Sequence, residues 1–188
     1  MRKIVVSEYL SLDGVFQDPN WTWPYWSEET AKFKYDELFG SEALLLGRVT
    51  YEGFAKAWPD MKDEQGYADR MNSLPKYVVT TTLEKGTWNN SNLLKDNIVE
   101  EITRLKQEEG QDILVFGSAD LTQTLLENNL VDQYNLLIYP VVVGSGKRFF
   151  KEGATANLKV VNTKTFGSGV IALIYQPAPK EETKEAAK

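Results

Sequence analysis

The chain has 188 residues, of which 42% are hydrophobic and 26% are charged, as in an ordinary folded domain with a sizeable core. It contains neither Cys nor His, which excludes a Cys/His zinc site, a Cys nucleophile and a Ser-His-Asp triad. A formal net charge of −6 disfavours broad nucleic-acid binding, because that binding needs clustered Lys and Arg.

The N-terminal sequence predicts no targeting or membrane segment. Arg2 and Lys3 precede an apolar stretch, but Glu8 and Asp13 interrupt it, so we do not expect a signal peptide. No uninterrupted apolar run approaches the length of a membrane span. We therefore expect a cytoplasmic protein with no membrane or nucleic-acid partner. Without Cys or His, any difficult chemistry is expected to come from a cofactor.

Local signals in the first half of the chain predict alternating strands and helices. Turn residues, N-cap residues and apolar periodicity mark their ends. The expected elements are a strand over 4–12 that ends at Asp13-Gly14, an aromatic loop over 16–26, a helix capped by Ser27 and closed by Gly40, a buried strand over 43–46, a helix ending near Trp58, a polar and partly helical segment over 60–73, and a strand over 76–82.

The second half continues this alternation and then ends in β structure. The expected elements are a brief strand at 93–94, a helix capped by Asp96 and closed by Gly110, a strand over 112–116, a helix after Gly117-Ser118, a long strand over 133–143 with an edge or bulge at Pro140, and a hairpin of strands over 158–166 and 170–176. We predict one α/β domain over 1–176. It has a mixed, mostly parallel sheet with helices on both faces and a C-terminal antiparallel hairpin, followed by a charged, frayed or loosely helical tail over 177–188.

Three turns at strand ends have the chemistry of phosphate contacts. An apolar strand runs into Gly117, Ser118 and Ala119, where free N–H groups at a helix N-terminus can bind an anion. The other two offer Arg48 with the Thr50 hydroxyl, and the hydroxyls of 80–82. Taken singly, each also fits an ordinary cap, an exposed Arg or simple β-forming residues. The Rossmann motif G-x-G-x-x-G is absent, so no single motif assigns a nucleotide.

The order of segments resembles the dihydrofolate reductase-like fold, and within it the reductase domain of riboflavin biosynthesis, the RibD C-terminal domain. The segments that carry the resemblance span about residues 3–176. They are Ser11-Leu12-Asp13-Gly14, Leu46-Gly47-Arg48-Val49-Thr50-Tyr51-Glu52, Val115-Phe116-Gly117-Ser118, and Pro140-Val141-Val142-Val143-Gly144-Ser145-Gly146 before Phe149-Phe150.

The resemblance implies binding of NADPH. In the family, the matching turns contact the cofactor phosphates, which here assigns Gly47, Arg48, Thr50, Gly117, Ser118 and Ala119. It also implies that Thr80, Thr81 and Thr82 lie near the adenosine ribose, that Asp13 and Gly14 lie beside the nicotinamide and substrate, and that Gly144 and Gly146 lie on the opposite side of the nicotinamide. We expect NADPH to be preferred over NADH, because Arg48 can meet a 2′-phosphate. Ser118 departs from the family's second glycine, which makes one backbone position less permissive.

The same resemblance suggests where the substrate chemistry lies. Glu29, next to Glu28, is nearest to the acid that polarises the pterin in dihydrofolate reductases, and Asp13 is the second candidate. Acids in the first turn of a helix also favour the helix dipole without any catalysis. Trp23 and Trp26 fall where the fold places a substrate lid, although packing inside the fold or in a dimer interface also suits them.

The leading hypothesis is an NADPH-dependent oxidoreductase, similar to 5-amino-6-(5-phosphoribosylamino)uracil reductase or to dihydrofolate reductase. Its substrate would be a small planar heterocycle, either ribosylaminopyrimidine-like or pterin-like. The folate reading needs a cation for the glutamate tail, and Arg70 is the one roughly placed. The alternative is a non-catalytic nucleotide-binding or dimerisation module that kept the fold. No metal is expected, and the resemblance implies a homodimer.

Overall fold

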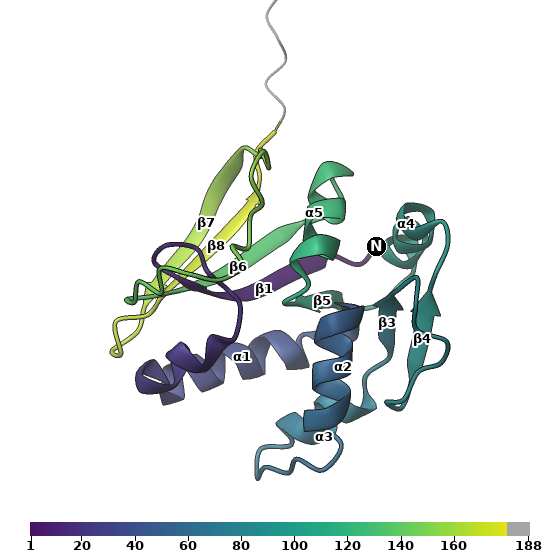
Figure 1. Cartoon of the computed structure of the whole chain (residues 1–188), viewed down its shortest axis with the longest axis horizontal. Helices are drawn as coiled ribbons and strands as arrows, with labels where there is room; N and C mark the ends of the chain where they lie inside the picture. The colour runs from purple at the N-terminus through teal and green to yellow at the C-terminus, as the bar shows by residue number, and fades with distance from the viewer. Residues whose placement is uncertain (180–188) are drawn as a thin grey trace, which may run out of the picture.

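The computed structural model describes residues 1–179, which form three layers around one eight-stranded sheet (Figure 1). The strands are β1 (Ile4–Ser11), β2 (Ser41–Gly47), β3 (Lys76–Val79), β4 (Ser91–Leu94), β5 (Asp112–Phe116), β6 (Gln133–Tyr139), β7 (Leu158–Thr165) and β8 (Ile171–Pro177). The helices are η1 (Pro19–Tyr25, a 3-10 helix), α1 (Glu28–Phe39), α2 (Arg48–Ala57), α3 (Tyr67–Ser73), α4 (Ile98–Gln107) and α5 (Ala119–Glu127).

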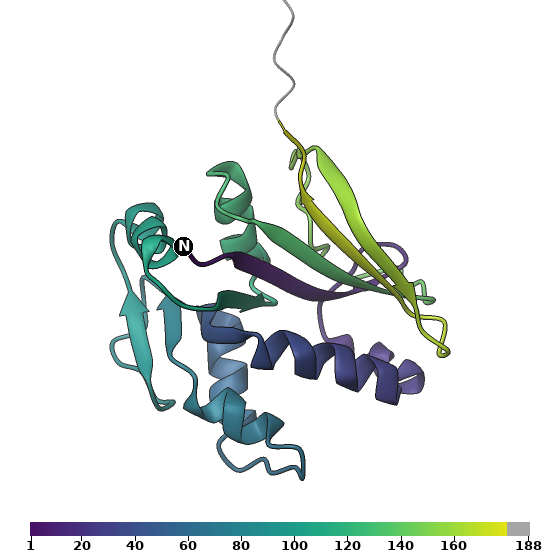
Figure 2. The same ribbon diagram turned by 180° about the vertical axis from the view of Figure 1, so that it is seen from behind.

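The strand order is β4-β3-β2-β5-β1-β6-β8-β7, with β1 near the centre. The first six strands in this order, from β4 at the edge through β1 to β6, are parallel to one another. The strand β8 runs antiparallel to both β6 and β7. The helices α4 and α5 lie on one side of the sheet, and α1, α2 and α3 on the other, as both views show (Figures 1 and 2). The predicted fold, a mostly parallel mixed sheet with helices on both faces and a C-terminal antiparallel hairpin, is confirmed.

The central strands are buried on both faces because helices cover both. Along β1, Ile4 and Val6 enter the core beneath α4 and α5, while Val5 enters the core against α1, α2 and α3. This follows from the alternation of side chains along a strand. An apolar run without a polar face is typical of strands in parallel sheets. Within residues 1–179, no helix combines the length and apolarity that a membrane crossing requires.

Several predicted boundaries are shifted, and each shift has a local cause. The strand predicted over 76–82 ends at Val79, because the Thr80 hydroxyl accepts the N–H groups of Thr82 and Leu83 and turns the chain. The strand predicted to reach residue 143 ends at Tyr139, since Pro140 has no N–H to continue the ladder.

Two predicted helix caps had different outcomes. The cap at Ser27 is confirmed, because its hydroxyl accepts the Thr30 N–H at 3.2 Å. The cap at Asp96 is wrong: the N-cap residue of α4 is Asn97, which has a left-handed backbone and makes no side-chain cap. The aromatic loop contains the short 3-10 helix η1. Most of the predicted tail, residues 180–188, lies outside the described residues.

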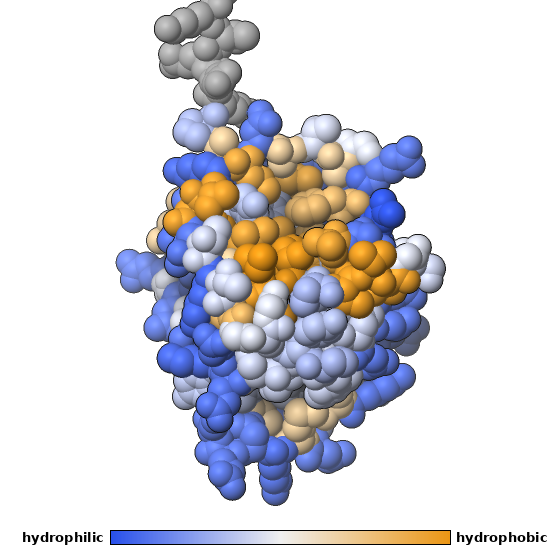
Figure 3. All heavy atoms as spheres, turned by 90° about the vertical axis from the view of Figure 1, so that its left-hand side faces the viewer, coloured by the Kyte–Doolittle hydropathy of each residue, from blue (hydrophilic) through white to orange (hydrophobic). Residues whose placement is uncertain are grey.

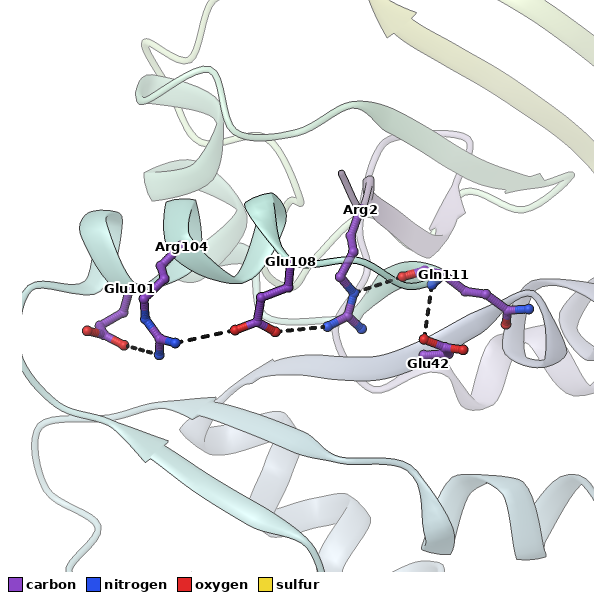
Figure 4. Close-up of polar contacts among 6 residues, drawn as sticks. All are labelled: Arg2, Glu42, Glu101, Arg104, Glu108 and Gln111. Atoms are coloured by element: carbon purple, nitrogen blue, oxygen red, sulfur yellow. Dashed lines mark hydrogen bonds and ion pairs between the residues drawn. The ribbon is translucent and has the colours of Figure 1, made fainter.

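A polar chain ties the start of β1 to α4 and β2 (Figure 4). The buried Arg2 donates from Nε to the Gln111 carbonyl at 2.8 Å and lies 3.8 Å from Glu108. Glu108 also pairs with Arg104 at 3.3 Å, and the Gln111 N–H donates to Glu42 at 3.0 Å. These polar contacts thus hold the segment that leads into β5 against the N-terminus.

Replacing Arg2 with Met should lower the free energy of unfolding by about 1–2 kcal/mol, because a charge-assisted hydrogen bond of a buried side chain is lost. Arg104→Met is the matched control. Arg104 is 61% exposed, so its loss should lower the free energy of unfolding much less than the loss of Arg2. Urea unfolding of both variants measures the difference, and equal losses would contradict this account of Arg2.

Candidate active site

The parting of β1 and β5 opens a large cavity. The two strands pair only as far as Ser7 and Phe116, whereas β1 continues beside β6 as far as Ser11. The last residues of β1 therefore have no strand neighbour on the β5 side. A cavity of about 1390 Å³ lies there, at the carboxyl ends of β2, β3 and β5. In open α/β sheets this edge is where ligands bind.

Two of the predicted phosphate turns touch each other at this cavity. The Ser118 hydroxyl accepts the Gly47 N–H at 2.8 Å, although the two residues are 71 positions apart. It also lies 2.9 Å from the Phe116 carbonyl and 3.1 Å from the Thr50 hydroxyl. The turns before α2 and α5 are thereby joined into one surface with two helix N-termini. Gly47, Arg48, Thr50, Gly117, Ser118 and Ala119 all line the cavity.

The backbone of the second turn is left-handed at two successive residues. Gly117 has a φ of 54° and Ser118 a φ of 60°. A Cβ on Gly117 would lie 2.8 Å from the Thr50 hydroxyl oxygen, so glycine is required for this contact. Ser118 adopts the same conformation at some cost, and its hydrogen bond to Gly47 offsets that cost.

Cations from two segments of the chain line the cavity. Arg48 begins α2 and pairs with Glu52 one turn later at 2.8 Å, with both side chains about 40% exposed. The second segment contributes Lys147, Arg148 and Lys151, which the sequence reasoning did not single out. Lys151 pairs with Asp120 at the start of α5, and this hydrogen bond lowers the pKa of the Asp120 carboxyl.

Of the three threonines predicted to contact the cofactor, two lie at the cavity. Thr80 and Thr81 line the cavity, whereas Thr82 is not among the lining residues. The Thr80 side chain is buried, and its hydroxyl forms the turn that ends β3. This end of the cavity thus carries one hydroxyl already held by the backbone and one that is exposed.

Asp13 and Gly14 lie outside the cavity lining, in a set of contacts between two loops that we call the clasp. Asp13 accepts the Ser11 hydroxyl at 2.7 Å and the N–H groups of Val143 and Gly144 at 3.0 and 2.9 Å. These bonds, led by that of Ser11, lower the pKa of Asp13 to about 2. The Gly14 carbonyl accepts the Phe149 N–H, which ties the same two loops together. The clasp fixes the loop that carries the basic residues 147–151.

A glycine in the opposite loop is needed for that clasp. Gly146 has a φ of 118°, and a Cβ on it would lie 2.9 Å from Val15. Neither Gly144 nor Gly146 lines the cavity. The structure therefore places this loop directly against the Asp13 turn, and neither glycine at the cavity surface.

The helix acid and the two tryptophans lie elsewhere. Glu29 accepts the Gly167 N–H at 2.7 Å, in the β7–β8 turn. Trp23 and Trp26 are 70% and 46% exposed, and none of these three residues lines the cavity. The aromatic loop is held instead by Trp21, whose ring meets Tyr139 edge to face at 5.6 Å.

The acid that does lie in the cavity is Glu8, on β1. Its side chain is only 8% exposed, and it accepts the Tyr9 N–H at 3.0 Å through Oε1. Burial raises the pKa of the Glu8 carboxyl from 4.5 to about 8. The sequence could have pointed to Glu8, since it is the only charged residue in the apolar stretch between Ile4 and Leu12.

A buried ion pair lies near Glu8 at the floor of the cavity. Lys34 on α1 pairs with Glu37 at 2.6 Å, donates to the Ser7 hydroxyl, and lies 4.5 Å from the centroid of the Phe116 ring. Glu37 in turn accepts from Asn135 on β6 at 2.7 Å. The spacing of Lys34 and Glu37 on one helix is visible in the sequence, but their burial depends on the fold.

An aromatic surface lies beside these polar groups in the cavity. Phe54, Trp58, Tyr67 and Phe116 line it, and Phe54 packs edge to face on Phe116 at 6.1 Å. Tyr9, Phe16 and Phe150 also line the cavity. Its aromatic surface therefore comes from several elements, and not from the tryptophans of the loop. Among residues 1–179, no group of His, Cys, Asp or Glu is arranged to hold a metal ion.

The model of the RibD C-terminal domain family matches residues 2–172. The chain belongs to this family. Two Bacillus subtilis relatives cover most of the chain. YyaP is 33% identical over 93% of this chain and 94% of its own, and YwjB is 28% identical over 90% and 95%.

Solved structures of similar proteins share the fold. A protein of Shewanella sp. PV-4, provisionally described as a riboflavin biosynthesis protein, has a TM-score of 0.75 at 19% identity and covers 94% of this chain and 99% of its own. A diaminohydroxyphosphoribosylaminopyrimidine deaminase/5-amino-6-(5-phosphoribosylamino)uracil reductase of Thermotoga maritima has a TM-score of 0.67 at 17% identity. That match covers 94% of this chain and 57% of the longer one. At these identities the likeness establishes the fold.

Gly117→Ala should lower the free energy of unfolding by about 1–3 kcal/mol, because it adds left-handed strain and a clash with Thr50. Gly53→Ala is the control. It lies inside α2 with open space around its Cβ, so it should stabilise by about 0.5–1 kcal/mol. Urea unfolding distinguishes the two, and a neutral Gly117→Ala would contradict the close contact.

Proposed function

We propose that this protein is an NADPH-dependent reductase that acts on a small planar heterocycle. The observation that carries the proposal is the joined pair of turns at Gly47–Thr50 and Gly117–Ala119. There, two helix N-termini and a glycine cradle border one cavity at the carboxyl ends of parallel strands. Membership of the RibD C-terminal domain family supports the same assignment.

The residues present fit the cofactor. A pyrophosphate would lie on the N–H groups of 117–119, which the glycine at 117 leaves open to close approach. Arg48 and the Thr50 hydroxyl would hold the phosphate of the adenosine ribose, beside Thr80 and Thr81. When bound, NADPH supplies hydride from C4 of its nicotinamide ring.

The protein contributes orientation and exclusion of water. The unpaired edge of β1 after Ser7 offers backbone groups for an amide, and the aromatic surface of Phe54, Trp58 and Phe116 suits a flat ring. Holding two rings face to face converts a bimolecular step into one within a complex. The clasp at Asp13 keeps the loop over 147–151 at the cavity mouth.

A ribosylaminopyrimidine is the substrate class favoured by the relatives, since the Thermotoga maritima protein is named a phosphoribosylaminouracil reductase. The cluster of Lys147, Arg148 and Lys151 would suit the phosphate of such a substrate. A pterin is the second candidate. The cation considered for a folate tail, Arg70, donates to the Ser41 carbonyl and is not among the lining residues.

The test compares cofactor binding with turnover. NADPH should raise the melting temperature, because a ligand of the native state stabilises it. NADPH oxidation should then proceed with at least one member of a panel of pterins, pyrimidines and quinones. Absence of both effects contradicts the proposal, whereas tight NADPH binding without turnover would favour the rival reading of a non-catalytic nucleotide-binding module.

Arg48→Ala should weaken NADPH binding by about 10- to 100-fold and NADH binding by less than about twofold, since only NADPH carries the 2′-phosphate. Glu52→Gln is the complementary variant. It frees Arg48 from its ion pair and should tighten NADPH binding severalfold. Titration calorimetry measures both cofactors, and equal effects of Arg48→Ala on the two would remove the assignment.

We also propose a homodimer, formed through the end of the sheet that β7 occupies. β7 is an edge strand with an exposed face, and edge strands readily pair with another chain. Figure 3 shows apolar residues gathered across this side of the molecule. The exposed apolar side chains of β7 and β8 include Val160, Val161 and Ile171.

Val160→Lys should shift the protein from dimer to monomer in analytical ultracentrifugation, because a charge replaces an apolar side chain that is 57% exposed in the single chain. Val49→Lys is the control, as Val49 is 72% exposed on α2, away from β7. A wild-type protein that sediments as a monomer at all concentrations would contradict the proposal.

A further inference from the structure

Four carboxylates line the cavity, and one differs from the rest. Asp18, Asp120 and Glu152 are exposed to solvent. Glu8 is buried at the floor, where β1 separates from β5. It is therefore the lining carboxyl whose proton is held away from bulk water.

The two oxygens of Glu8 have different environments. Oε1 accepts the Tyr9 N–H, one of the backbone groups left without a strand partner where β5 ends. Oε2 is buried and has no hydrogen-bond partner among the described residues. Burying a carboxylate oxygen without a hydrogen-bond partner costs free energy. If that oxygen is protonated, it can donate a hydrogen bond to an acceptor on a bound ligand, and the cost is removed.

The charged and titratable groups around Glu8 come from three elements. Burial disfavours the ionised form and outweighs the hydrogen bond from the Tyr9 N–H and the charge of Lys34 on α1, which favour it. The Gly117 N–H lies nearby and adds a smaller effect in the same direction, but it is outside hydrogen-bonding geometry. Lys34 is itself neutralised by Glu37, with which it forms an ion pair at 2.6 Å. The Tyr9 side chain adds no positive charge. A proton on Glu8 is consequently retained at neutral pH, yet the carboxylate left behind would lie near an ammonium.

We propose that Glu8 is the proton donor of the reaction, delivering a proton from Oε2 to the nitrogen or oxygen of a polarised C=N or C=O bond. This inference rests on the proposed reductase function. NADPH, when bound, would supply hydride to the carbon of that bond, and the π electrons of the bond would take the proton from Glu8 Oε2. The products are the C–H and N–H (or O–H) bonds, NADP⁺ and the Glu8 carboxylate, which recovers a proton from water.

Glu8 also satisfies the geometric conditions for this role. It projects from the strand whose free edge borders the cavity, and Oε1 is fixed by the Tyr9 N–H, so the carboxyl is oriented before substrate binds. Glu29 and Asp13 are both committed to backbone N–H groups outside the lining. A general acid with a pKa near the working pH is the effective one.

The first experiment tests the protonation of Glu8 without any substrate. A carboxyl whose pKa is raised on folding from 4.5 to about 8 gives stability that is complete below the lower value and lost as the pH rises through the upper one. Glu8→Gln still accepts the Tyr9 N–H but has no proton to lose. Its melting temperature relative to wild type should therefore rise between about pH 5 and about pH 9.

The control for this measurement is Glu28→Gln, which makes the same chemical change at an exposed position outside the cavity. It should run parallel to wild type across the whole pH range. If the Glu8→Gln curve also runs parallel to wild type, Glu8 ionises normally and the proposal is overturned.

The second experiment measures turnover with two probes, dihydrofolate for a C=N bond and menadione for C=O bonds. Glu8→Gln should lower kcat by about 100-fold or more, leave the Kd for NADPH within about twofold, and abolish the loss of kcat above about pH 8. Glu28→Gln should match wild type. A structural role alone would change stability without this split between kcat and Kd.

The outcomes separate this inference from the function on which it rests. If Glu8→Gln turns over either probe at the wild-type rate, the proton-donor role is overturned and the reductase stands. If wild type binds NADPH but reduces neither probe nor any member of the wider panel, both are overturned. Loss of turnover with intact NADPH binding supports both.

Discussion

The pairing of β1 with β5 ends at Ser7 and Phe116, and the site depends on where it ends. Beyond this point the chain of β5 turns away through two left-handed residues, while β1 continues beside β6. The backbone edge of β1 is thereby left open at the carboxyl end of a parallel sheet. The cavity occupies that gap, and the Glu8 carboxyl covers one of the freed N–H groups.

The walls of the cavity are held by contacts between distant parts of the chain. Ser118 joins the turns before α2 and α5, so their two helix N-termini border one cavity. Asp13 fixes the loop that bears the basic residues Lys147, Arg148 and Lys151. The floor is closed by the pair Lys34–Glu37. The cations and the buried Glu8 carboxyl thus line the same cavity.

Much of the fold was predictable because its signals are local. The strand over 112–116 has the predicted bounds, as apolar β-forming residues are followed at once by a glycine that the turn requires. Ser27 caps α1 as predicted. Ends that depend on a side chain folding back were misplaced, as where the Thr80 hydroxyl turns the chain and ends β3 early. The preference for Asn97 over Asp96 as a cap is likewise not encoded in composition.

The sequence by itself determined the mixed sheet, the order of the strand-end turns and the exclusion of Cys and His catalysis, and it predicted phosphate contacts at those turns. Only the tertiary structure decided that the turns at 47 and 117 touch, and that Glu8 rather than Glu29 lies in the cavity. The physical reason is that strand pairing and burial are set by contacts between distant residues. A glutamate side chain can therefore bind a turn at the surface, as Glu29 does, or lie buried in a cavity, as Glu8 does, and the surrounding fold decides which.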